Sequence, residues 1–263
     1  MNIEKALKFR EMHGRADGIV LLNVWDAASA AIVQAQGAEA IATSSASLAW
    51  ANGYPDGNAM PVEVLVAAVG NISRVCRVPL TVDIEAGYSD SEGDILQLLE
   101  GLLSLGVVGI NIEDGQSEPE VLERKIQAIR NHFGSERLFI NARSDVYLNG
   151  LHPKDSCFTE LKRRLEIYSQ AGADGLFVPG LLDLALINEL SRELTLPLNV
   201  MLSSSETKQA DYIEAGVKRI SYGPASFLAV YEGLGKFSRR QTSESELDYT
   251  AMNALMSERG QTL

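Results

Sequence analysis

One pattern recurs along this 263-residue chain and limits the folds that it can adopt: a helical stretch ends in a glycine, and a short apolar run follows almost at once. The glycines of its four occurrences are Gly37, Gly106, Gly172 and Gly216. Glycine readily takes the left-handed conformation at which helices end, and a short continuous apolar run is typical of a strand buried in a parallel sheet. The repeat therefore predicts helices that alternate with buried parallel strands.

Filling the intervals between these junctions gives eight predicted strands, at residues 20–25, 39–43, 80–85, 107–113, 138–143, 175–178, 198–201 and 219–222. Predicted helices separate them, among them residues 61–75, 94–105, 119–132, 158–171, 183–194 and 207–215, and residues 224–235 follow the last strand as a further helix. Eight strand-then-helix units in about 250 residues are typical of a (β/α)8 barrel. An open, doubly wound sheet is the alternative, but the first strand is not followed by its Gly-x-Gly-x-x-Gly turn. We expect an α/β fold with a single TIM-barrel domain over residues 1–263.

Two segments lie outside the repeat. Residues 44–60 are predicted to form a long loop after the second strand, and loops of that length in compact domains are usually functional. The barrel with its N-terminal helix is expected to occupy residues 1–238, and a C-terminal helical extension residues 239–263. In the extension, a polar linker at residues 239–246 precedes a helix at residues 247–256. Because that helix has no strand to follow, we expect it to pack on a neighbouring subunit.

Acidic residues mark the ends of the third and fourth predicted strands. Asp83 and Glu85 lie two residues apart in an apolar run rich in β-branched residues, and on an extended strand such residues point to the same side. Glu113 ends the next strand. Like charges held close together are costly unless a cation or a shared proton neutralises them. A hard divalent cation would explain three oxygen donors from two strand ends, and acidic turns on a solvated rim are the alternative.

Barrel enzymes place their active sites at the C-terminal ends of the strands. Those ends carry acids, hydroxyls, an amide and one guanidinium, and Asp56 joins them from the long loop: Trp25, Ser44, Ser45, Asp83, Glu85, Glu113, Arg143, Asn199 and Tyr222. Oxygen donors without histidine or thiolate favour Mg2+ or Mn2+ over zinc. Arg143 has the fork geometry that binds a substrate carboxylate or phosphonate, and an ion pair with Asp145 or another acid is its alternative role.

The composition disfavours several classes of partner. A net charge of −12 argues against nucleic acid, because phosphate binding needs a basic surface. The N-terminus is amphipathic rather than signal-like, and no apolar run is long enough to span a bilayer, so no membrane partner is expected. The two cysteines, Cys76 and Cys157, suggest no disulfide framework and fit a reducing compartment. We therefore expect a cytoplasmic protein. The negative charge does not exclude a small anionic substrate, because a bound metal can reverse the local sign.

Two covalent mechanisms lack the residues that they need. A Schiff-base aldolase uses a lysine at a strand end, whereas the lysines here fall on predicted helices, loops or a strand start. A Ser-His-acid relay needs a histidine near a strand end, and only His152 is near one. Metal-assisted chemistry on an oxyanion remains, most simply an enolate held against the cation.

Four motifs in order along the chain resemble the isocitrate lyase / phosphoenolpyruvate mutase superfamily, and the resemblance covers nearly the whole chain. They are Ser44-Ser45-Ala46 followed by Gly53-Tyr54-Pro55-Asp56, then Asp83-Ile84-Glu85-Ala86-Gly87-Tyr88, then Ile112-Glu113-Asp114, and finally Asn141-Ala142-Arg143. The resemblance implies a Mg2+ ion held by Asp83, with Asp56, Glu85 and Glu113 contributing mostly through waters. It also implies that Ser44, Ser45 and Ala46, together with Arg143, bind the acid groups of the substrate. Members of the superfamily form dimers and tetramers by exchanging a C-terminal helix, so we expect a homodimer or homotetramer with a swapped C-terminal segment.

The chain also departs from the superfamily pattern. Lyases carry a cysteine and a histidine after the Glu-Asp pair, where this chain reads Gly115-Gln116-Ser117-Glu118-Pro119. Mutases carry a lysine and a longer mobile lid there, and a histidine where this chain has Val178-Pro179-Gly180. Glu85 stands where the superfamily has a shorter aspartate. Typical isocitrate cleavage and phosphoryl migration are therefore disfavoured.

We expect a Mg2+-dependent lyase that acts on a small 2-oxo or 2-hydroxy carboxylate through a metal-stabilised enolate, by C–C cleavage or decarboxylation. The alternatives are cleavage or migration at a P–C bond and a non-catalytic metabolite-binding barrel. The candidate catalytic residues are Arg143, Glu113 and Tyr88, and Trp25 and Asn199 are further candidate substrate-binding residues. Tyr88, Tyr147, His152 or an ordered water could deliver the proton.

Overall fold

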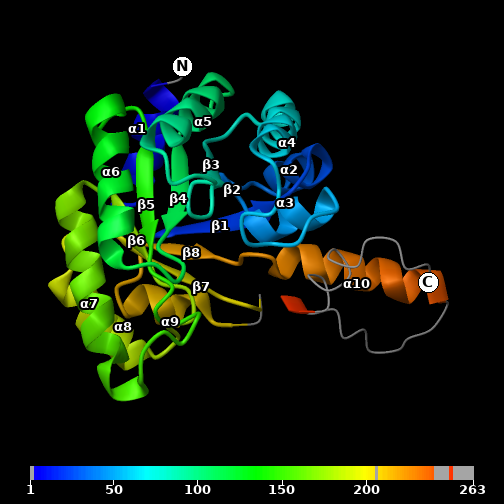
Figure 1. The fold of residues 1–263 in the computed structure, drawn as a ribbon. Helices are drawn as coiled ribbons and strands as arrows, with labels where there is room; N and C mark the ends of the chain where they lie inside the picture. The colour runs from blue at the N-terminus through cyan, green and yellow to red at the C-terminus, as the bar shows by residue number, and fades with distance from the viewer. Residues whose placement is uncertain (1–2, 205–206, 240–248, 251–263) are drawn as a thin grey trace.

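The computed structural model describes residues 3–204, 207–239 and 249–250, and it is a closed barrel of eight parallel strands surrounded by helices (Figure 1). Each strand pairs with the next along the chain, and β1 pairs with β8 to close the ring. The strands are β1 (Ile19–Val24), β2 (Ile41–Thr43), β3 (Leu80–Asp83), β4 (Gly109–Glu113), β5 (Phe139–Arg143), β6 (Gly175–Phe177), β7 (Leu198–Met201) and β8 (Arg219–Ser221). The helices are α1 (Ile3–Met12), α2 (Ala27–Ala35), α3 (Ser45–Ala51), α4 (Val62–Val75), α5 (Glu92–Ser104), α6 (Pro119–Phe133), α7 (Lys154–Ala171), α8 (Leu184–Glu193), α9 (Gln209–Glu214) and α10 (Ala225–Arg239). The predicted (β/α)8 barrel is confirmed.

The glycine junctions behave as their sequence pattern predicts. The glycines that end the four helical stretches all have left-handed backbones, with φ values between 87° and 107°. At Gly216 a Cβ atom would also lie 2.3 Å from the hydroxyl of Ser191, so both the backbone and the packing require glycine there. Each strand end lies within two residues of its predicted position.

The inside of the barrel is polar. Asn111 of β4 accepts a hydrogen bond from the Arg219 guanidinium of β8 at 3.0 Å, and Asn141 of β5 donates to Asn199 of β7 at 3.0 Å. Neither pair lies on neighbouring strands, so both bonds cross the barrel interior. Asn141 also donates to Asn111 at 2.9 Å, which joins the four buried side chains into one network. Buried polar groups need such partners, and Arg219 meets this need only through Nη2, because its buried Nε and Nη1 have no hydrogen-bond partner among the described residues.

Apolar side chains occupy two other places. One large cluster lies between the strands and the helices that surround them, and it includes the fully buried Val82 and Ile110 of the strands and Leu99 and Ile126 of the helices. A smaller cluster joins α1 to the barrel, where the fully buried Phe9 packs edge-on against Phe139 at 5.5 Å between ring centroids. Helix α1 therefore closes the end of the barrel opposite the C-terminal ends of the strands.

The prediction of one long loop over residues 44–60 was wrong in its first half. Residues 45–51 form the short helix α3, because Ser44 caps its start by accepting a hydrogen bond from the amide of Ser47 at 3.4 Å and its side chains are buried. Helix α7 begins four residues earlier than predicted, directly after Pro153, whose fixed φ suits a helix start.

The predicted linker at residues 239–246 and most of the predicted helix at residues 247–256 lie outside the described residues. Tyr249 and Thr250 are described and helical. The Tyr249 hydroxyl donates to Asp56 Oδ2 at 2.6 Å, and its ring lies 5.5 Å from that of Trp50. Of the described helices, none combines the length and apolar character needed to cross a membrane.

Candidate active site

Asp83 is the last residue of β3 and is nearly buried, with 7% of its surface exposed. Its position is fixed on three sides. Its amide donates to the Thr43 hydroxyl at 3.0 Å, its Oδ1 accepts from the Glu85 amide at 3.0 Å, and its Oδ2 accepts from Asn111 Nδ2 at 3.4 Å. Burial raises the pKa of the Asp83 carboxyl, and the nearby Arg143 charge opposes that rise. Asp83 is thus a preoriented carboxylate whose negative charge is only partly compensated.

Glu85 faces Asp83, but the reason predicted for this was wrong. Strand β3 ends at Asp83, and Glu85 has a left-handed backbone with φ 51°, so the two residues do not share one face of an extended strand. A tight turn instead brings them together, with the Gly87 amide donating to the Ile84 carbonyl at 2.8 Å. A non-glycine residue at positive φ is strained, and such strain is often found at functional sites.

The Glu85 carboxylate is held by neighbours from two segments. Oε1 accepts from the Tyr88 hydroxyl at 2.8 Å, and Oε2 accepts from the amide of Asn58 in the segment between α3 and α4. Burial first, and then the charge of Asp56, raise the pKa of Glu85 from its usual 4.5 to about 7. Asp56 therefore lies near Asp83 and Glu85, as predicted from the sequence.

Arg143 ends β5 between two carboxylates. Its Nη1 lies 2.7 Å from Glu113 Oε2, while Nε and Nη2 contact the two oxygens of Asp145 at 2.6 and 3.1 Å. The register of β4 and β5 pairs Glu113 directly with Arg143, which is why the two side chains meet. Burial raises the pKa of Glu113 well above its usual value, against the lowering effect of Arg143. The ion pair proposed as an alternative role for Arg143 is thus present in this structure.

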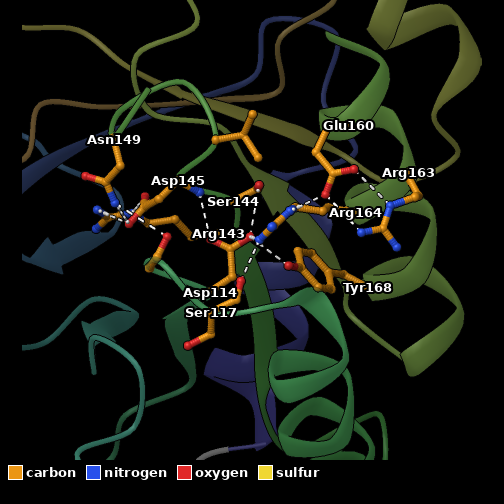
Figure 2. Close-up of polar contacts among 12 residues, drawn as sticks. Asp114, Ser117, Arg143, Ser144, Asp145, Asn149, Glu160, Arg163, Arg164 and Tyr168 are labelled. Carbon is orange, nitrogen blue, oxygen red and sulfur yellow. Dashed lines mark hydrogen bonds and ion pairs between the residues drawn. The ribbon is translucent and has the colours of Figure 1, made fainter. Parts of the chain in front are cut away.

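Asp114 points away from these groups into a second buried network (Figure 2). Its carboxylate accepts four hydrogen bonds, from the Asp145 amide at 2.8 Å, the Ser144 hydroxyl at 3.1 Å, Arg164 Nη1 at 3.0 Å and the Tyr168 hydroxyl at 2.7 Å. Figure 2 shows Arg164 and Tyr168 of α7 on one side of Asp114 and Asp145 on the other. Asp114 therefore holds the loop that carries Asp145 on the side that faces α7.

Arg164 and Tyr168 did not appear among the residues predicted from the sequence. They lie four residues apart on α7, so they occupy the same face of the helix. Both are buried, with Tyr168 0% and Arg164 3% exposed. An arginine on the inward face of an amphipathic helix is the signal that could have identified them, since a buried guanidinium needs an acidic partner.

The loop residues predicted to bind substrate lie beside Asp83. Ser44 follows β2, the neighbour of β3, and the buried Ser45 and Ala46 form the first turn of α3. Thr43, whose hydroxyl accepts a hydrogen bond from the Asp83 amide, directly precedes these residues. The structure thus gathers the segment 44–46, the β3 acids, Tyr88, Glu113 and Arg143 at the C-terminal end of the barrel.

Trp25 and Asn199 are the two further residues predicted to bind substrate. Trp25 follows Val24 of β1, which pairs with Thr43 of β2, and its ring packs edge-on against Phe227 of α10 at 5.0 Å between ring centroids. It also lines a cavity of about 410 Å3 with Tyr231. Asn199 was placed at the end of its strand, but it lies two residues before the end of β7, inside the barrel, bonded to Asn141. Both side chains take part in packing or in the interior network.

The group of carboxylates suits a hard cation. Asp83, Glu85 and Glu113 supply only oxygen donors, and each has a pKa raised by burial and by the charge of at least one other acid of the site. Across residues 3–204, 207–239 and 249–250, no three His, Cys, Asp or Glu side chains are grouped closely enough to bind one metal ion directly. The donor set fits an ion that has one direct carboxylate ligand and contacts the other acids through water, which Mg2+ commonly does.

Comparisons with known proteins agree with the fold. Residues 9–241 match the family model of phosphoenolpyruvate phosphomutase. A crystal structure from Burkholderia cenocepacia J2315, provisionally named a phosphonomutase, is 36% identical, covers 90% of this chain and 99% of its own, and superposes with a TM-score of 0.84. A phosphonopyruvate hydrolase solved with oxalate and Mg2+ is 19% identical over 97% of this chain and 95% of its own, with a TM-score of 0.76.

Two relatives with named reactions are similar over most of the chain. The 2-methylisocitrate lyase of Aeropyrum pernix is 28% identical and aligns with 85% of this chain and 75% of its own length. An oxaloacetate decarboxylase of Rhodopseudomonas palustris is 28% identical and aligns with 70% of this chain and 66% of its own length.

Proposed function

Because the chain belongs to the phosphoenolpyruvate phosphomutase family, we propose that it is a Mg2+-dependent lyase that cleaves a C–C bond of, or decarboxylates, a small 2-oxo or 2-hydroxy carboxylate. The observation that carries the proposal is the pairing of Arg143 with Glu113, next to the buried Asp83 and Glu85. The residues proposed to hold the cation and the guanidinium proposed to bind the anion thus lie side by side, as an anionic substrate held against a metal would require. The lyase and decarboxylase among the relatives support this class of reaction.

Asp83 would hold the ion directly, and Glu85, Glu113 and Asp56 would contact it through water. Mn2+ has the same preference for oxygen ligands and is the alternative ion. The bound ion would stabilise negative charge that develops on the keto oxygen of the substrate when the bond breaks. The protein holds several buried carboxylates close together at a cost in electrostatic repulsion, which a bound ion would reduce.

Arg143 would bind the substrate carboxylate by exchanging one partner. Asp145 contacts Nε and Nη2 and so fixes the plane of the guanidinium, whereas Nη1 contacts Glu113. A substrate carboxylate can replace Glu113 at Nη1 without disturbing the contact with Asp145. The amides and hydroxyls of Ser44, Ser45 and Ala46, on the neighbouring strand end, would bind the remaining acid oxygens.

Among the candidate proton donors, the geometry favours Tyr88. Its hydroxyl donates to Glu85 at 2.8 Å, so it lies within the group of acids. Tyr147 instead lies against the Cys157 thiol, and the His152 ring faces Glu160 of α7 at 4.0 Å. Tyr88 is therefore proposed as the donor, with Glu85 holding its hydroxyl in place.

The test is turnover of a panel of 2-oxo acids, with release of carbon dioxide from oxaloacetate compared with release of phosphate from phosphonopyruvate. The Asp83→Asn variant should lose Mg2+-dependent turnover, and Asp17→Asn, the same change at an exposed aspartate before β1, is the control. Full activity of Asp83→Asn would refute the assignment. Phosphate release alone would favour P–C chemistry, which the provisional name of the Burkholderia protein supports.

A non-catalytic metabolite-binding barrel is the remaining alternative. It predicts thermal stabilisation by Mg2+ with oxalate but no turnover of any acid in the panel.

We further propose that the chain is one barrel domain that forms a homodimer or homotetramer. Exposed apolar side chains on α10 support an interface there, since Val230, Leu234 and Phe237 are 57%, 57% and 84% exposed and lie along one side of the helix. Figure 1 shows α10 running outward from the barrel. A cytoplasmic location stays a prediction from the two free cysteines.

A further inference from the structure

Two loops of the candidate site are each held by a buried basic side chain from a helix further along the chain. The loop after β3 accepts a hydrogen bond from Lys125 Nζ of α6 at the Ala86 carbonyl, at 2.8 Å. The loop after β4 accepts one from Arg164 Nη1 of α7 at the Ser117 carbonyl, at 2.9 Å. Lys125 is 6% exposed and Arg164 3% exposed. Burying a cation is costly. Two buried cations that each bind a loop of the site therefore indicate that they serve to hold those loops in place.

The loop after β4 has little freedom. Only residues 114–118 separate β4 from α6, and Pro119 occupies the first turn of that helix. Within the segment, the Ser117 amide donates to the Asp114 carbonyl at 2.8 Å. Arg164 then binds both ends of it, because it contacts the Asp114 carboxylate as well as the Ser117 carbonyl. The segment is thus fixed at Asp114 and at Ser117.

The same contacts extend to the residue proposed to bind substrate. Asp114 Oδ1 accepts from the Asp145 amide at 2.8 Å, and the Asp145 carboxylate contacts Arg143 through both of its oxygens. Figure 2 shows this continuous path from α7 through Asp114 to Arg143. A shift of Arg164 would therefore move the backbone that carries Asp145, and with it the guanidinium of Arg143.

We propose that Arg164 and Lys125 are positioning residues that hold the two acidic loops in one arrangement, so that residues 114–118 form a stationary wall of the site rather than a lid that closes on substrate. The anchoring of the loops stands on the contacts alone. Its effect on ligand affinity rests on the proposed function, because it acts through Arg143. The two parts are therefore measured separately.

The first measurement is amide hydrogen exchange of the ligand-free protein. In Arg164→Met, peptides covering residues 114–118 should exchange at least about tenfold faster, and in Lys125→Met the same should hold for residues 84–88. The chain supplies matched controls in Arg163→Met and Lys162→Met. Arg163 bonds the same Glu160 as Arg164 does but is 46% exposed. The Lys162 side chain is 33% exposed and pairs with Glu189 and Glu193 on the surface. Exchange in both controls should equal that of the wild type.

The second measurement is affinity. Loss of one charged hydrogen-bond donor should weaken the binding of oxalate in the presence of Mg2+ by roughly tenfold in Arg164→Met. KM should rise more than kcat falls, and Arg164→Lys should restore part of the affinity. Should Arg164→Met fail to fold, Tyr168→Phe removes one donor to Asp114 at lower cost and should shift exchange and affinity in the same direction.

Two results would overturn the proposal. One is strong protection of residues 114–118 in the wild type when Mg2+ and oxalate are added, which would reveal a closing lid. The other is unchanged exchange of those residues in both Arg164→Met and Tyr168→Phe. If Arg143→Met leaves oxalate binding unchanged, the proposed function fails, and the exchange results still decide the anchoring.

Discussion

The metal-free protein should lose stability as the pH rises through neutrality, because Glu85 is easier to protonate in the folded state. Its pKa of about 7 in the folded chain exceeds its usual 4.5, so between these values the folded chain binds more protons than the unfolded chain. The stability that this group contributes is fully present below pH 4.5 and is lost as the pH rises through about 7. At about 1.4 kcal/mol per pH unit, the difference corresponds to about 3 kcal/mol, of which about 2 kcal/mol falls between pH 5.5 and 8.

The assay is urea unfolding with EDTA present, followed by circular dichroism from pH 5.5 to 8, above the isoelectric point of about 4.8. The free energy of unfolding should fall by about 2 kcal/mol more in the wild type than in Glu85→Gln, which cannot titrate. The exposed Glu118→Gln serves as control and should follow the wild type. Parallel pH profiles of wild type and Glu85→Gln would refute the reasoning. Saturating Mg2+ should flatten the wild-type profile, because the bound ion would offset the repulsion between the ionised Glu85 and the neighbouring carboxylates.

Four further outcomes are expected. Asp114→Asn should lower the free energy of unfolding by about 3 kcal/mol in urea melts, because it removes a buried acceptor and counter-charge from Arg164. Arg143→Lys should weaken oxalate binding, measured calorimetrically with Mg2+, by at least about tenfold, because a lysine loses the fork. Tyr88→Phe should lower kcat by about a hundredfold with little change in oxalate affinity if it delivers the proton, and an unchanged kcat would exclude that role. Phe237→Glu should reduce the oligomer mass seen by light scattering, whereas an unchanged mass would exclude α10 as an interface.

The barrel was predictable because its signals are local. Each buried strand is a short apolar run, and a glycine that ends a helix marks where the next strand will start, as Gly172 and Gly216 do. The strand ends then place Asp83, Glu113 and Arg143 on one face of any such barrel.

What the sequence did not predict depends on contacts between distant residues or on unusual backbone conformations. Arg164 and Asp114 are 50 residues apart, and no local pattern links them. The left-handed Glu85 is bonded by an amide 27 residues earlier in the chain, at Asn58, so propensity alone favoured a longer strand. Helix α3 is only seven residues long and is stabilised by the burial of nearly all of its side chains, which a periodic pattern over so short a segment cannot predict.

The hydrogen bonds inside the barrel also have a direction. The Arg219 guanidinium can only donate, so Asn111 must turn its oxygen toward Arg219 and its amide nitrogen toward Asp83. A second donor, Asn141, fixes the same orientation. Arg219, deep in the barrel, thereby requires Asp83 at the C-terminal end of the strands to accept a hydrogen bond from Asn111. Transplanting these carboxylates into another eight-stranded scaffold would therefore mean carrying over the side chains beneath them as well, because those side chains determine which atom each loop acid presents.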